Sequence, residues 1–588
     1  MEKKLDLVFL WHMHQPDYRD HGDADGVDGA DGVDGVGATF MLPWVYLHAI
    51  KDYADMAAHL ERHPTIRCVV NFVPVLLDQI EDYAAQFSTA CFRDPLLRLL
   101  ATADLSTITR ADRQLLLDTC FRSNHHTMLA PFPHYQRLHD LYLNLADTGQ
   151  AALDYLSGAY LSDLVTWYHL AWTGEAERRA NPLIARLMSK GEGFGPADRT
   201  QLINALGKLI GNLLPRYKAL AARGQIELSS TPQTHPLSPL LLDFHAARES
   251  IPNAPLPATA GYPGGQSRVL NQIAEARASH AARFGAPPVG MWPAEGAISA
   301  PFVRHLAQSG CRWIASGEGV LKNSLVASGI NAGINNAPRA AYHPWQLADA
   351  PGLTLFFRDE RLSDLIGFDY AKWHGRDAAA HLVAQLDVIR TSAADGETPV
   401  VGIVLDGENA WEHYPYNGYY FFDDLYQLLA AHPNIRTTTY GDLCNTLPTT
   451  LPTTLPTTLP KLVAGSWVYG SLSTWIGDAE KNHAWDLLCA AKRSYDLVFA
   501  SGRLNREKST LATRQLAICE SSDWFWWFGD YNPAAAVASF DHLFRRNLAR
   551  LYRLIELDPP AQLNNPISAG TTRHTATDGS MRRTTDSG

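Results

Sequence analysis

The 588-residue sequence contains few cysteines and no long hydrophobic segment. Its seven cysteines are scattered, odd in number and never spaced as a Cys-x-x-Cys pair, which argues against a disulfide framework or a zinc–thiolate site. No apolar stretch approaches the roughly 20 residues that a membrane-spanning helix needs. The first apolar run, residues 7–11, is too short for the hydrophobic core of a signal peptide. We therefore expect a cytoplasmic protein with reduced thiols and no membrane partner.

The sequence also lacks an excess of positive charge. It has 50 Lys and Arg residues against 61 Asp and Glu, a formal net charge of -11, which argues against nucleic acid as a partner. Its 46% hydrophobic and 19% charged residues are typical of a globular protein, and its length allows more than one domain. The 15 Trp and 23 Tyr residues gather near acidic residues, a combination that suits a carbohydrate substrate.

Apolar, β-branched runs alternate with helical patterns over about the first 440 residues. Residues from about 75 to 220 are mostly helical by periodicity and form an insertion between two strands. Alternating strands and helices predict a parallel barrel or a doubly wound sheet. We expect strands at residues 5–11, 66–72, 224–230, 288–292, 313–315, 353–357, 400–405 and 435–438.

Two repeats interrupt this pattern and mark the expected boundaries. Residues 23–37 repeat Asp-Gly, a low-complexity pattern that predicts a flexible surface loop. Asp-Gly repeats can bind calcium, but the ligand spacings of calcium-binding loops are missing here. Residues 446–460 repeat Leu-Pro-Thr-Thr and predict an extended linker, since proline blocks helix and central strand. We expect a catalytic domain over residues 1–445, a helical domain over 461–565 and a disordered tail over 566–588.

Two predicted strands end in carboxylates with a tryptophan nearby. Asp406 follows the run 400–405, with Trp411 close behind, and Glu295 follows Trp292 at the end of the run 288–292. Barrel enzymes present catalytic groups at strand ends, and carboxylate pairs perform the acid/base and nucleophilic work of glycosidases. Taken singly, Glu295 is explained by a helix N-terminus and Asp406 by a tight turn. Together they favour a sugar-cleaving site.

Histidines and aromatic residues add further candidates. His12 and His14 alternate on a strand and so point to one face, where they suit zinc ligation, a hydrogen bond to a sugar hydroxyl, or a place in the core. No Asp-Asp pair or His-x-x-x-His is placed to complete a zinc site. Asp523 and Trp524 lie in an unusually aromatic stretch that predicts either a buried helix or a wall of the substrate site.

Five motifs, which occur along the chain in the same order as in glycoside hydrolase family 57, resemble those of that family, over about residues 5–565. A sixth stretch, from residue 356 to Asp364, is similar to the α-amylase and amylopullulanase subgroup. The two repeats are departures that touch no motif. The five motifs are His14-Gln15-Pro16, Gly224-Gln225-Ile226-Glu227 followed by His235-Pro236, Trp292-Pro293-Ala294-Glu295, Asp406-Gly407-Glu408-Asn409 and Ser522-Asp523-Trp524.

The resemblance implies an α/β fold, with an incomplete parallel (β/α)7 barrel that carries helical insertions and is followed by an α-helical C-terminal domain. It implies a retaining mechanism in which Glu295 is the nucleophile and Asp406 the general acid/base, about 5–5.5 Å apart. Asp406 then needs a raised pKa, which burial and the charge of Glu295 favour. Glu408 is the rival acid, but Asp406 is the first carboxylate past the strand.

The resemblance also implies the substrate and its contacts. His14 would bind the glycosyl unit, and the expected substrate is glycogen, starch or a maltooligosaccharide, cleaved at α-1,4 or α-1,6 bonds without cofactor or metal. Alternatives are a 4-α-glucanotransferase or branching enzyme with the same residues, a zinc-dependent deacetylase or α-mannosidase-like hydrolase, and a non-catalytic glucan-binding protein. The sequence does not decide the oligomeric state. Trp292, Trp411 and Trp524 are candidate platforms on which sugar rings would stack. Further substrate contacts are expected from Gln15, His235, Trp292, Glu408, Trp411, Asp523 and Trp524.

Overall fold

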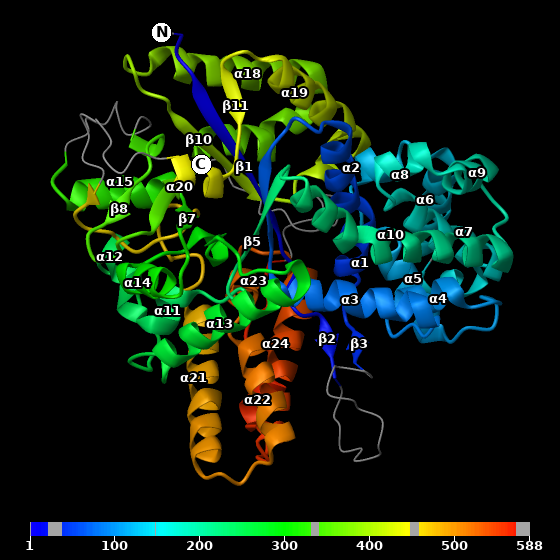
Figure 1. Ribbon diagram of the computed structural model, residues 1–588. Helices are drawn as coiled ribbons and strands as arrows, with labels where there is room; N and C mark the ends of the chain where they lie inside the picture. The colour runs from blue at the N-terminus through cyan, green and yellow to red at the C-terminus, as the bar shows by residue number, and fades with distance from the viewer. Residues whose placement is uncertain (1, 22–37, 148, 331–339, 447–457, 572–588) are drawn as a thin grey trace.

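Parallel strands form a nearly closed barrel at the centre of the computed structural model (Figure 1). The structure describes residues 2–21, 38–147, 149–330, 340–446 and 458–571. Neighbouring strands run in the order β10-β1-β4-β5-β6-β7-β9, and each neighbouring pair is parallel. Their bounds are β1 (Leu5–Met13), β4 (Cys68–Phe72), β5 (Ile226–Ser230), β6 (Gly290–Met291), β7 (Trp313–Ser316), β9 (Thr354–Phe357) and β10 (Val400–Asp406).

A single bridge closes the barrel between β9 and β10. Arg358, just past β9, pairs with Gly402 of β10, and the backbone N–H of Asp359 donates to the Gly402 carbonyl oxygen at 2.7 Å. A further strand, β11 (Ile435–Thr437), pairs only with the first residues of β1. The predicted seven-stranded, incomplete parallel barrel is therefore confirmed.

Side chains along each strand alternate between the barrel interior and the surrounding helices. On β1, Val8 and Leu10 belong to a small interior cluster, whereas Leu7, Phe9 and Trp11 belong to the large core under the helices. All of these side chains are buried, which explains why the strand appears in the sequence as a continuous apolar run.

Closely packed side chains fill the interior of the barrel. A Cβ on Gly290 would lie 2.2 Å from the Trp313 ring, so only glycine fits there. At the amino-terminal end of the strands, Tyr440 of α20 (Tyr440–Thr446) stacks on Phe356 with ring centroids 4.4 Å apart. Its hydroxyl lies 2.5 Å from where a Cβ on Gly402 would be. Chemistry is thus confined to the carboxyl ends of the strands.

Helices from α3 to α10 fill the predicted insertion between β4 and β5 and lie on the right of Figure 1. The last of them, α10, runs for 27 residues through Pro215. The helices are α3 (Pro74–Thr89), α4 (Pro95–Ala101), α5 (Arg110–Thr119), α6 (Pro133–Ala146), α7 (Gly158–Ala171), α8 (Glu175–Ala180), α9 (Pro182–Lys190) and α10 (Pro196–Ala222).

Other helices connect the remaining strands of the barrel. Residues 44–62 are helical throughout, but a π-helical turn at Ala49–Tyr53 separates the two α-helical parts. These helices are α1 (Trp44–His48), α2 (Ala54–Arg62), α11 (Ser238–Leu242), α12 (Ala247–Ser250), α13 (Gly265–Phe284), α14 (Ala300–Gln308), α15 (Glu318–Ala327), α17 (Glu360–Asp364), α18 (Gly375–Ser392) and α19 (Tyr419–Ala431).

The C-terminal part of the chain is helical, as its periodicity predicts. Helices α21 (Ala479–Ala500), α22 (Arg506–Cys519) and α24 (Ala534–Leu554) stand side by side in the lower part of Figure 1. The short helix α23 (Ser522–Trp527) lies against the barrel instead. It is joined there by an antiparallel bridge between Pro236 and Ser521, and by a 2.9 Å hydrogen bond from the Ser522 N–H to the His235 carbonyl.

Short strands and unplaced segments complete the description. The Asp-Gly repeat at 23–37, most of the Leu-Pro-Thr-Thr repeat and the tail after residue 571 lie outside the described residues. Where the chain resumes, β12 (Thr458–Leu459) pairs in parallel with β8 (Gln346–Leu347), and β2 (Arg19–Asp20) pairs with β3 (Thr39–Phe40).

Within the described part of the chain, every helix is too short or too polar to cross a bilayer.

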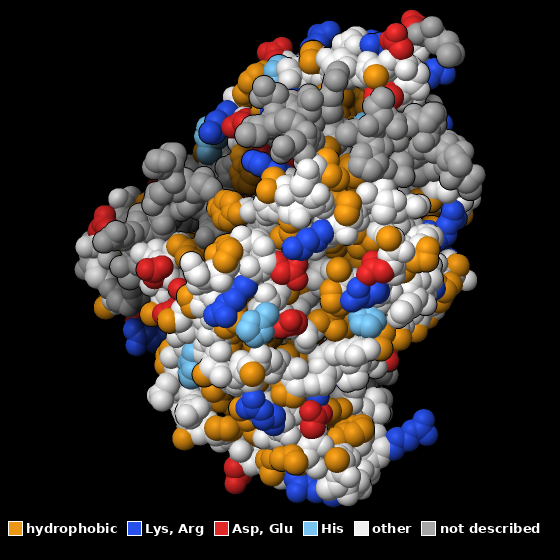
Figure 2. Space-filling view, turned by 90° about the vertical axis from the view of Figure 1, so that its left-hand side faces the viewer, with side chains coloured by type: hydrophobic (Ala, Val, Ile, Leu, Met, Phe, Trp, Pro, Cys, Tyr) orange, Lys and Arg blue, Asp and Glu red, His pale blue; other side chains and the backbone are white. Residues whose placement is uncertain are grey.

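Basic and acidic side chains are interspersed among the described residues of the face seen in Figure 2, rather than gathered by sign.

Candidate active site

The carboxyl ends of the barrel strands bring polar side chains together at one edge. β1 carries His12 near its end and leads to His14, the segment after β6 carries Glu295, and β10 ends at Asp406. Helix α23 adds Asp523 from the C-terminal part of the chain. The structure therefore brings groups from both parts of the chain to one edge of the barrel.

Glu295 sits on a strained turn directly after β6. Its backbone adopts a left-handed conformation, φ 59° and ψ 21°, which costs about 1–3 kcal/mol and is found where surrounding contacts enforce it. Two of those contacts come from Trp467, whose backbone N–H donates to the Glu295 carbonyl at 3.1 Å and whose indole Nε1 donates to Oε2 at 3.0 Å. The Ser522 hydroxyl lies 3.4 Å from Oε1. The side chain remains partly exposed.

Asp406 is held by the barrel itself. It lies opposite His12 in the β1–β10 register, and the side-chain amide of Asn409 donates to its Oδ2 at 2.7 Å. The next residue, Gly407, donates its N–H to the His12 carbonyl at 2.7 Å. A Cβ at Gly407 would lie 2.0 Å from the Met13 sulfur, so a larger residue here would require the Met13 side chain to move. Asp406 is also partly exposed.

Burial raises the pKa of both carboxyls. The pKa of Glu295 rises to about 8, because the group is buried and because the charges of Asp406 and Asp523 add to the effect. Burial raises the pKa of Asp406 to about 6, against the Asn409 hydrogen bond and the positive charges of His14 and Arg358. Such a pair titrates as one unit, so between these values it holds a single proton.

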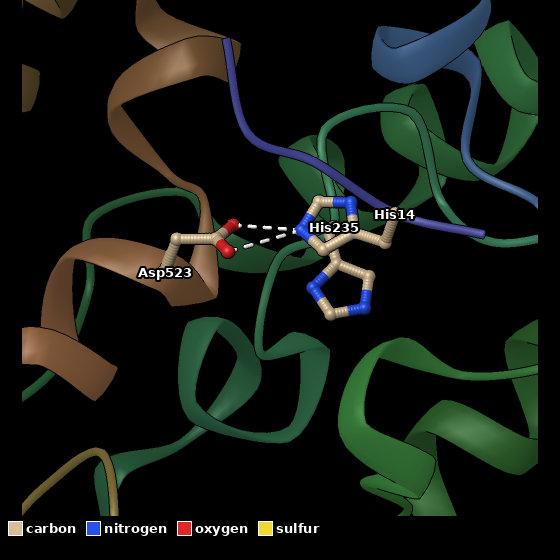
Figure 3. A group of neighbouring side chains, drawn as sticks. All are labelled: His14, His235 and Asp523. Carbon is tan, nitrogen blue, oxygen red and sulfur yellow. Dashed lines mark hydrogen bonds and ion pairs between the residues drawn. The ribbon is translucent and has the colours of Figure 1, made fainter. Parts of the chain in front are cut away.

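His14 is tethered to Asp523 across the site (Figure 3). Its Nε2 lies 2.9 Å from Oδ2 and 3.1 Å from Oδ1 of that carboxylate. The carboxylate also accepts from the Ser521 hydroxyl at 2.6 Å. The other ring nitrogen of His14, Nδ1, is buried and has no hydrogen-bond partner among the described residues. The imidazole is thus held in place with one nitrogen available.

Behind His14, two buried imidazoles form a chain of contacts. His12 Nδ1 lies 2.7 Å from the amide of Asn71, and its Nε2 lies 3.0 Å from Nε2 of His235. His235 Nδ1 in turn lies 2.8 Å from the Ser522 hydroxyl. Burial lowers the pKa of His12 to about 3 and that of His235 well below its usual range.

The histidines do not fit a zinc ion. The acceptor atoms of His14, His235 and Asp523 lie within 4.8 Å of one another, which makes them the candidate ligand set. The two rings, however, stack face to face, 3.8 Å between centroids with a 19° tilt. An imidazole nitrogen binds a metal in its ring plane at about 2.0–2.1 Å, and no point that close lies in both planes. His12 has both nitrogens engaged. The zinc alternative is therefore not supported.

The three tryptophans expected to stack on sugar do not face the site. Each is at most 1% exposed, so none offers a ring face to a substrate. Trp292 fills the barrel interior, and the other two rings pack between barrel and helices or within the C-terminal helices. A large ring gains most free energy when buried, and proximity to a motif does not show which way it points. The residues corrected here are Trp292, Trp411 and Trp524.

Gln15, His235 and Glu408 are also buried, each at most 3% exposed. Glu408 accepts from the His14 backbone N–H at 3.2 Å and from the Gln15 amide at 3.3 Å. Burial raises its pKa well above the usual range, and the charge of Asp406 adds to this. These three residues support the loop that carries His14 and are not placed to touch a substrate, in contrast to the expectation.

Trp467 is the residue that the sequence patterns miss. It follows the Leu-Pro-Thr-Thr repeat, outside every quoted motif, yet it bonds to Glu295 through both backbone and indole. Its ring is partly exposed, with the Arg358 guanidinium 5.2 Å from the centroid on one side and Trp292 at its edge. Ser522 lies inside a quoted motif, but no role follows for it from the sequence.

Comparison with known proteins places these observations in a family. A family model described as glycosyl hydrolase family 57 matches residues 8–456. A family 57 branching enzyme from Thermococcus kodakaraensis is similar in structure at 15% identity and a TM-score of 0.56, covering 94% of this chain and 90% of that chain. A branching enzyme from Pyrococcus horikoshii is similar at 16% identity and a TM-score of 0.54, covering 96% and 94%.

An α-amylase from Thermotoga maritima is similar at 15% identity and a TM-score of 0.52, covering 95% of this chain and 93% of that chain. No curated protein matches the chain by sequence. At these identities the likeness in structure supports the fold.

Proposed function

The chain belongs to glycosyl hydrolase family 57, and we propose from this that it is a retaining enzyme acting on α-glucans through Glu295 and Asp406. The observation that carries the proposal is the pair itself. The two carboxyls come from the ends of different barrel strands, remain partly exposed, and influence each other electrostatically in a buried site. Such a pair suits the retaining mechanism.

In the first step, Glu295 attacks the anomeric carbon and the glycosidic bond breaks. Asp406 gives its proton to the leaving oxygen, and the glycosyl unit stays on the enzyme as an ester. The ester removes the charge of Glu295, so Asp406, now ionised, becomes the base. It then takes a proton from water or from a sugar hydroxyl, whose oxygen attacks the anomeric carbon and releases Glu295.

His14 would hold the glycosyl unit during both steps. The Asp523 carboxylate can only accept, so Nε2 of His14 donates to it. Since Nδ1 has no partner among the described residues, a hydrogen bond with a sugar hydroxyl would satisfy a buried polar atom.

The same residues serve hydrolysis and transfer, because the two outcomes differ only in the acceptor. The solved relatives include branching enzymes and an α-amylase. We propose a hydrolase on the motif resemblance to α-amylases and amylopullulanases. We also propose residues 1–445 as the catalytic domain and 461–565 as a helical domain that completes the site.

One variant and the wild-type enzyme test the proposal with pure protein on maltoheptaose, glycogen and pullulan. Glu295→Gln should abolish turnover, and the wild-type enzyme should release products of the same anomeric configuration as the substrate. Near-normal turnover by Glu295→Gln would remove the nucleophile assignment. Product analysis separates outcomes: shorter sugars alone indicate hydrolysis, and longer or branched sugars indicate transfer.

A further inference from the structure

A continuous chain of contacts links the barrel interior to the nucleophile. It runs from Asn71 through His12 and His235 to Ser522, with separations of 2.7, 3.0 and 2.8 Å, and reaches Glu295 Oε1 after a further 3.4 Å. The two histidines are no more than 2% exposed and touch no substrate. On the role proposed above for Glu295, we propose that His12 and His235 are positioning residues that direct the hydroxyl proton of Ser522 onto the nucleophile.

The two imidazoles can carry the donor-to-acceptor order of the hydrogen bonds in only one direction at a time. Both are neutral near pH 7, because burial lowers the pKa of His12 to about 3 and that of His235 well below its usual range. A neutral imidazole has one N–H donor and one bare acceptor nitrogen. The Nε2–Nε2 contact therefore needs one donor and one acceptor. Whether Asn71 donates to His12 Nδ1 or accepts from it then fixes which nitrogen of each ring carries the proton. It also fixes the direction of the Ser522 hydroxyl proton.

The surroundings of Asn71 decide the direction. The oxygen and nitrogen of an amide are alike in shape, so the hydrogen-bond pattern shows which is which. The Oδ1 position lies 2.7 Å from His12 Nδ1 and 3.0 Å from Thr231 Oγ1. The single Thr231 hydroxyl proton has a shorter contact, 2.8 Å, to the Trp292 carbonyl, which can only accept. Thr231 thus faces Asn71 as an acceptor.

A half-turn of the Asn71 amide satisfies every group at once. Its two N–H protons then meet Thr231 and His12, and its carbonyl meets the Ser229 hydroxyl, 3.0 Å away, which can donate. His12 consequently accepts at Nδ1 and donates from Nε2. His235 accepts at Nε2 and donates from Nδ1 to the Ser522 oxygen, which leaves the Ser522 proton for Glu295.

The direction matters because Glu295 must be ionised when it attacks. Burial and the charges of Asp406 and Asp523 hold its proton on, whereas donors at both carboxylate oxygens, Trp467 on one and Ser522 on the other, favour the carboxylate. Each donor therefore increases the share of the pair's single proton that Asp406 holds, where the first step needs it. The ionisable groups that act on the pair are His14, Arg358, Asp523 and Glu408.

The test is the pH dependence of kcat/KM on maltoheptaose. Ser522→Ala removes the last donor, and Asn71→Leu removes the group that sets the direction without adding charge. Each should lower kcat/KM about tenfold and move the acid limb up by about one pH unit, the size expected for one hydrogen bond to a charged group. Ser522→Thr, which keeps the hydroxyl, should return the limb toward the wild-type position.

Ser229→Ala is the matched control, because it also deletes a contact of Asn71 but leaves the chain intact. Its acid limb should stay in place. If Asn71→Leu shows the wild-type limb while Ser522→Ala does not, the hydroxyl acts alone and the histidines have no such role. If loss of activity without a shifted limb is found in both, the effect is structural and the proposal is wrong.

A second readout needs no turnover. The protonated-carboxyl stretch of Glu295, identified by its loss in Glu295→Gln, can be titrated by infrared difference spectroscopy in the resting protein. Its midpoint should rise in Ser522→Ala and in Asn71→Leu and stay fixed in Ser229→Ala. If the wild-type protein turns over no α-glucan, the proposed function fails. Unchanged midpoints in this titration would separately overturn the positioning role of His12 and His235.

Discussion

The two carboxyls proposed as catalytic, Glu295 and Asp406, are held by different regions of the molecule. The direct contacts of Asp406 belong to the barrel: the register with His12 and the amide of Asn409. Glu295 instead takes its side-chain donors, Trp467 and Ser522, from the chain after residue 457. The barrel alone therefore places the acid, but the nucleophile is complete only when the C-terminal region is in contact.

Removal of the barrel-held acid should give the largest effect. Asp406→Asn should lower kcat on maltoheptaose by about 10²–10⁴-fold, the usual contribution of a general acid/base. A nitrophenyl maltooligosaccharide should lose much less in the first step, since its leaving group departs without a proton. Equal losses on both substrates would show that Asp406 does not protonate the leaving oxygen.

The pH profile of kcat/KM should report on both carboxyls in one measurement. kcat/KM should be bell-shaped, with limbs near the values of about 6 and about 8 that belong to the pair. Below the acid limb Glu295 is protonated and cannot attack, and above the basic limb Asp406 has no proton to give, so the rate falls about tenfold per pH unit on each side. A flat profile from pH 5 to 9 would contradict a shared proton.

Asp523→Asn comes next and tests the C-terminal region directly. Loss of a charged hydrogen bond to His14 should lower kcat/KM by about 10–100-fold. The negative charge of Asp523 raises the pKa of both carboxyls, so its removal should move both limbs to lower pH. This shift is opposite in sign to that expected for Ser522→Ala. Limbs that move upward would show that the charge does not act on the pair.

Trp467→Phe should have a smaller effect that still reports on the nucleophile. It keeps a ring but deletes the indole donor to Glu295, so kcat/KM should fall about tenfold and the acid limb should rise. Circular dichroism should show an unchanged fold. If binding falls and the limb stays, Trp467 contacts the sugar rather than the carboxylate.

Trp411→Phe should give the smallest change in catalysis. The ring is 1% exposed and donates to the Gly407 carbonyl at 2.9 Å, so its loss should reduce stability by about 1 kcal/mol. KM should stay within about twofold, because the ring does not face the substrate. A KM many times higher, with normal stability, would restore the stacking role expected from the sequence.

The sequence predicts the fold well because both faces of the barrel strands are buried. A strand such as β10, buried along nearly all its length, appears as an uninterrupted apolar run. β6 is shorter than its run at 288–292 suggests, since only Gly290 and Met291 pair as a strand before the chain turns into Glu295. The two carboxyls were predictable because strand ends point them to one edge.

Contacts between distant segments were not predictable in the same way. Trp467 reaches Glu295 only because the chain returns to the barrel after the second repeat, 172 residues further on. The burial of Trp524 depends equally on helix α24, which lies beyond it in the sequence. Local pattern shows that a side chain is present near a motif, whereas its direction depends on what packs above it.

The filled barrel has a consequence for the choice of acceptor. Tyr440 and the interior cluster fill the barrel behind the site. We therefore expect reactants to enter and leave at the carboxyl ends of the strands. Water cannot arrive from behind while the departing glucan fragment still occupies that opening. The residence time of the fragment therefore decides which acceptor reacts. A fragment that leaves quickly lets water finish the cycle, whereas one that stays, or is replaced by another chain, receives the glycosyl unit instead.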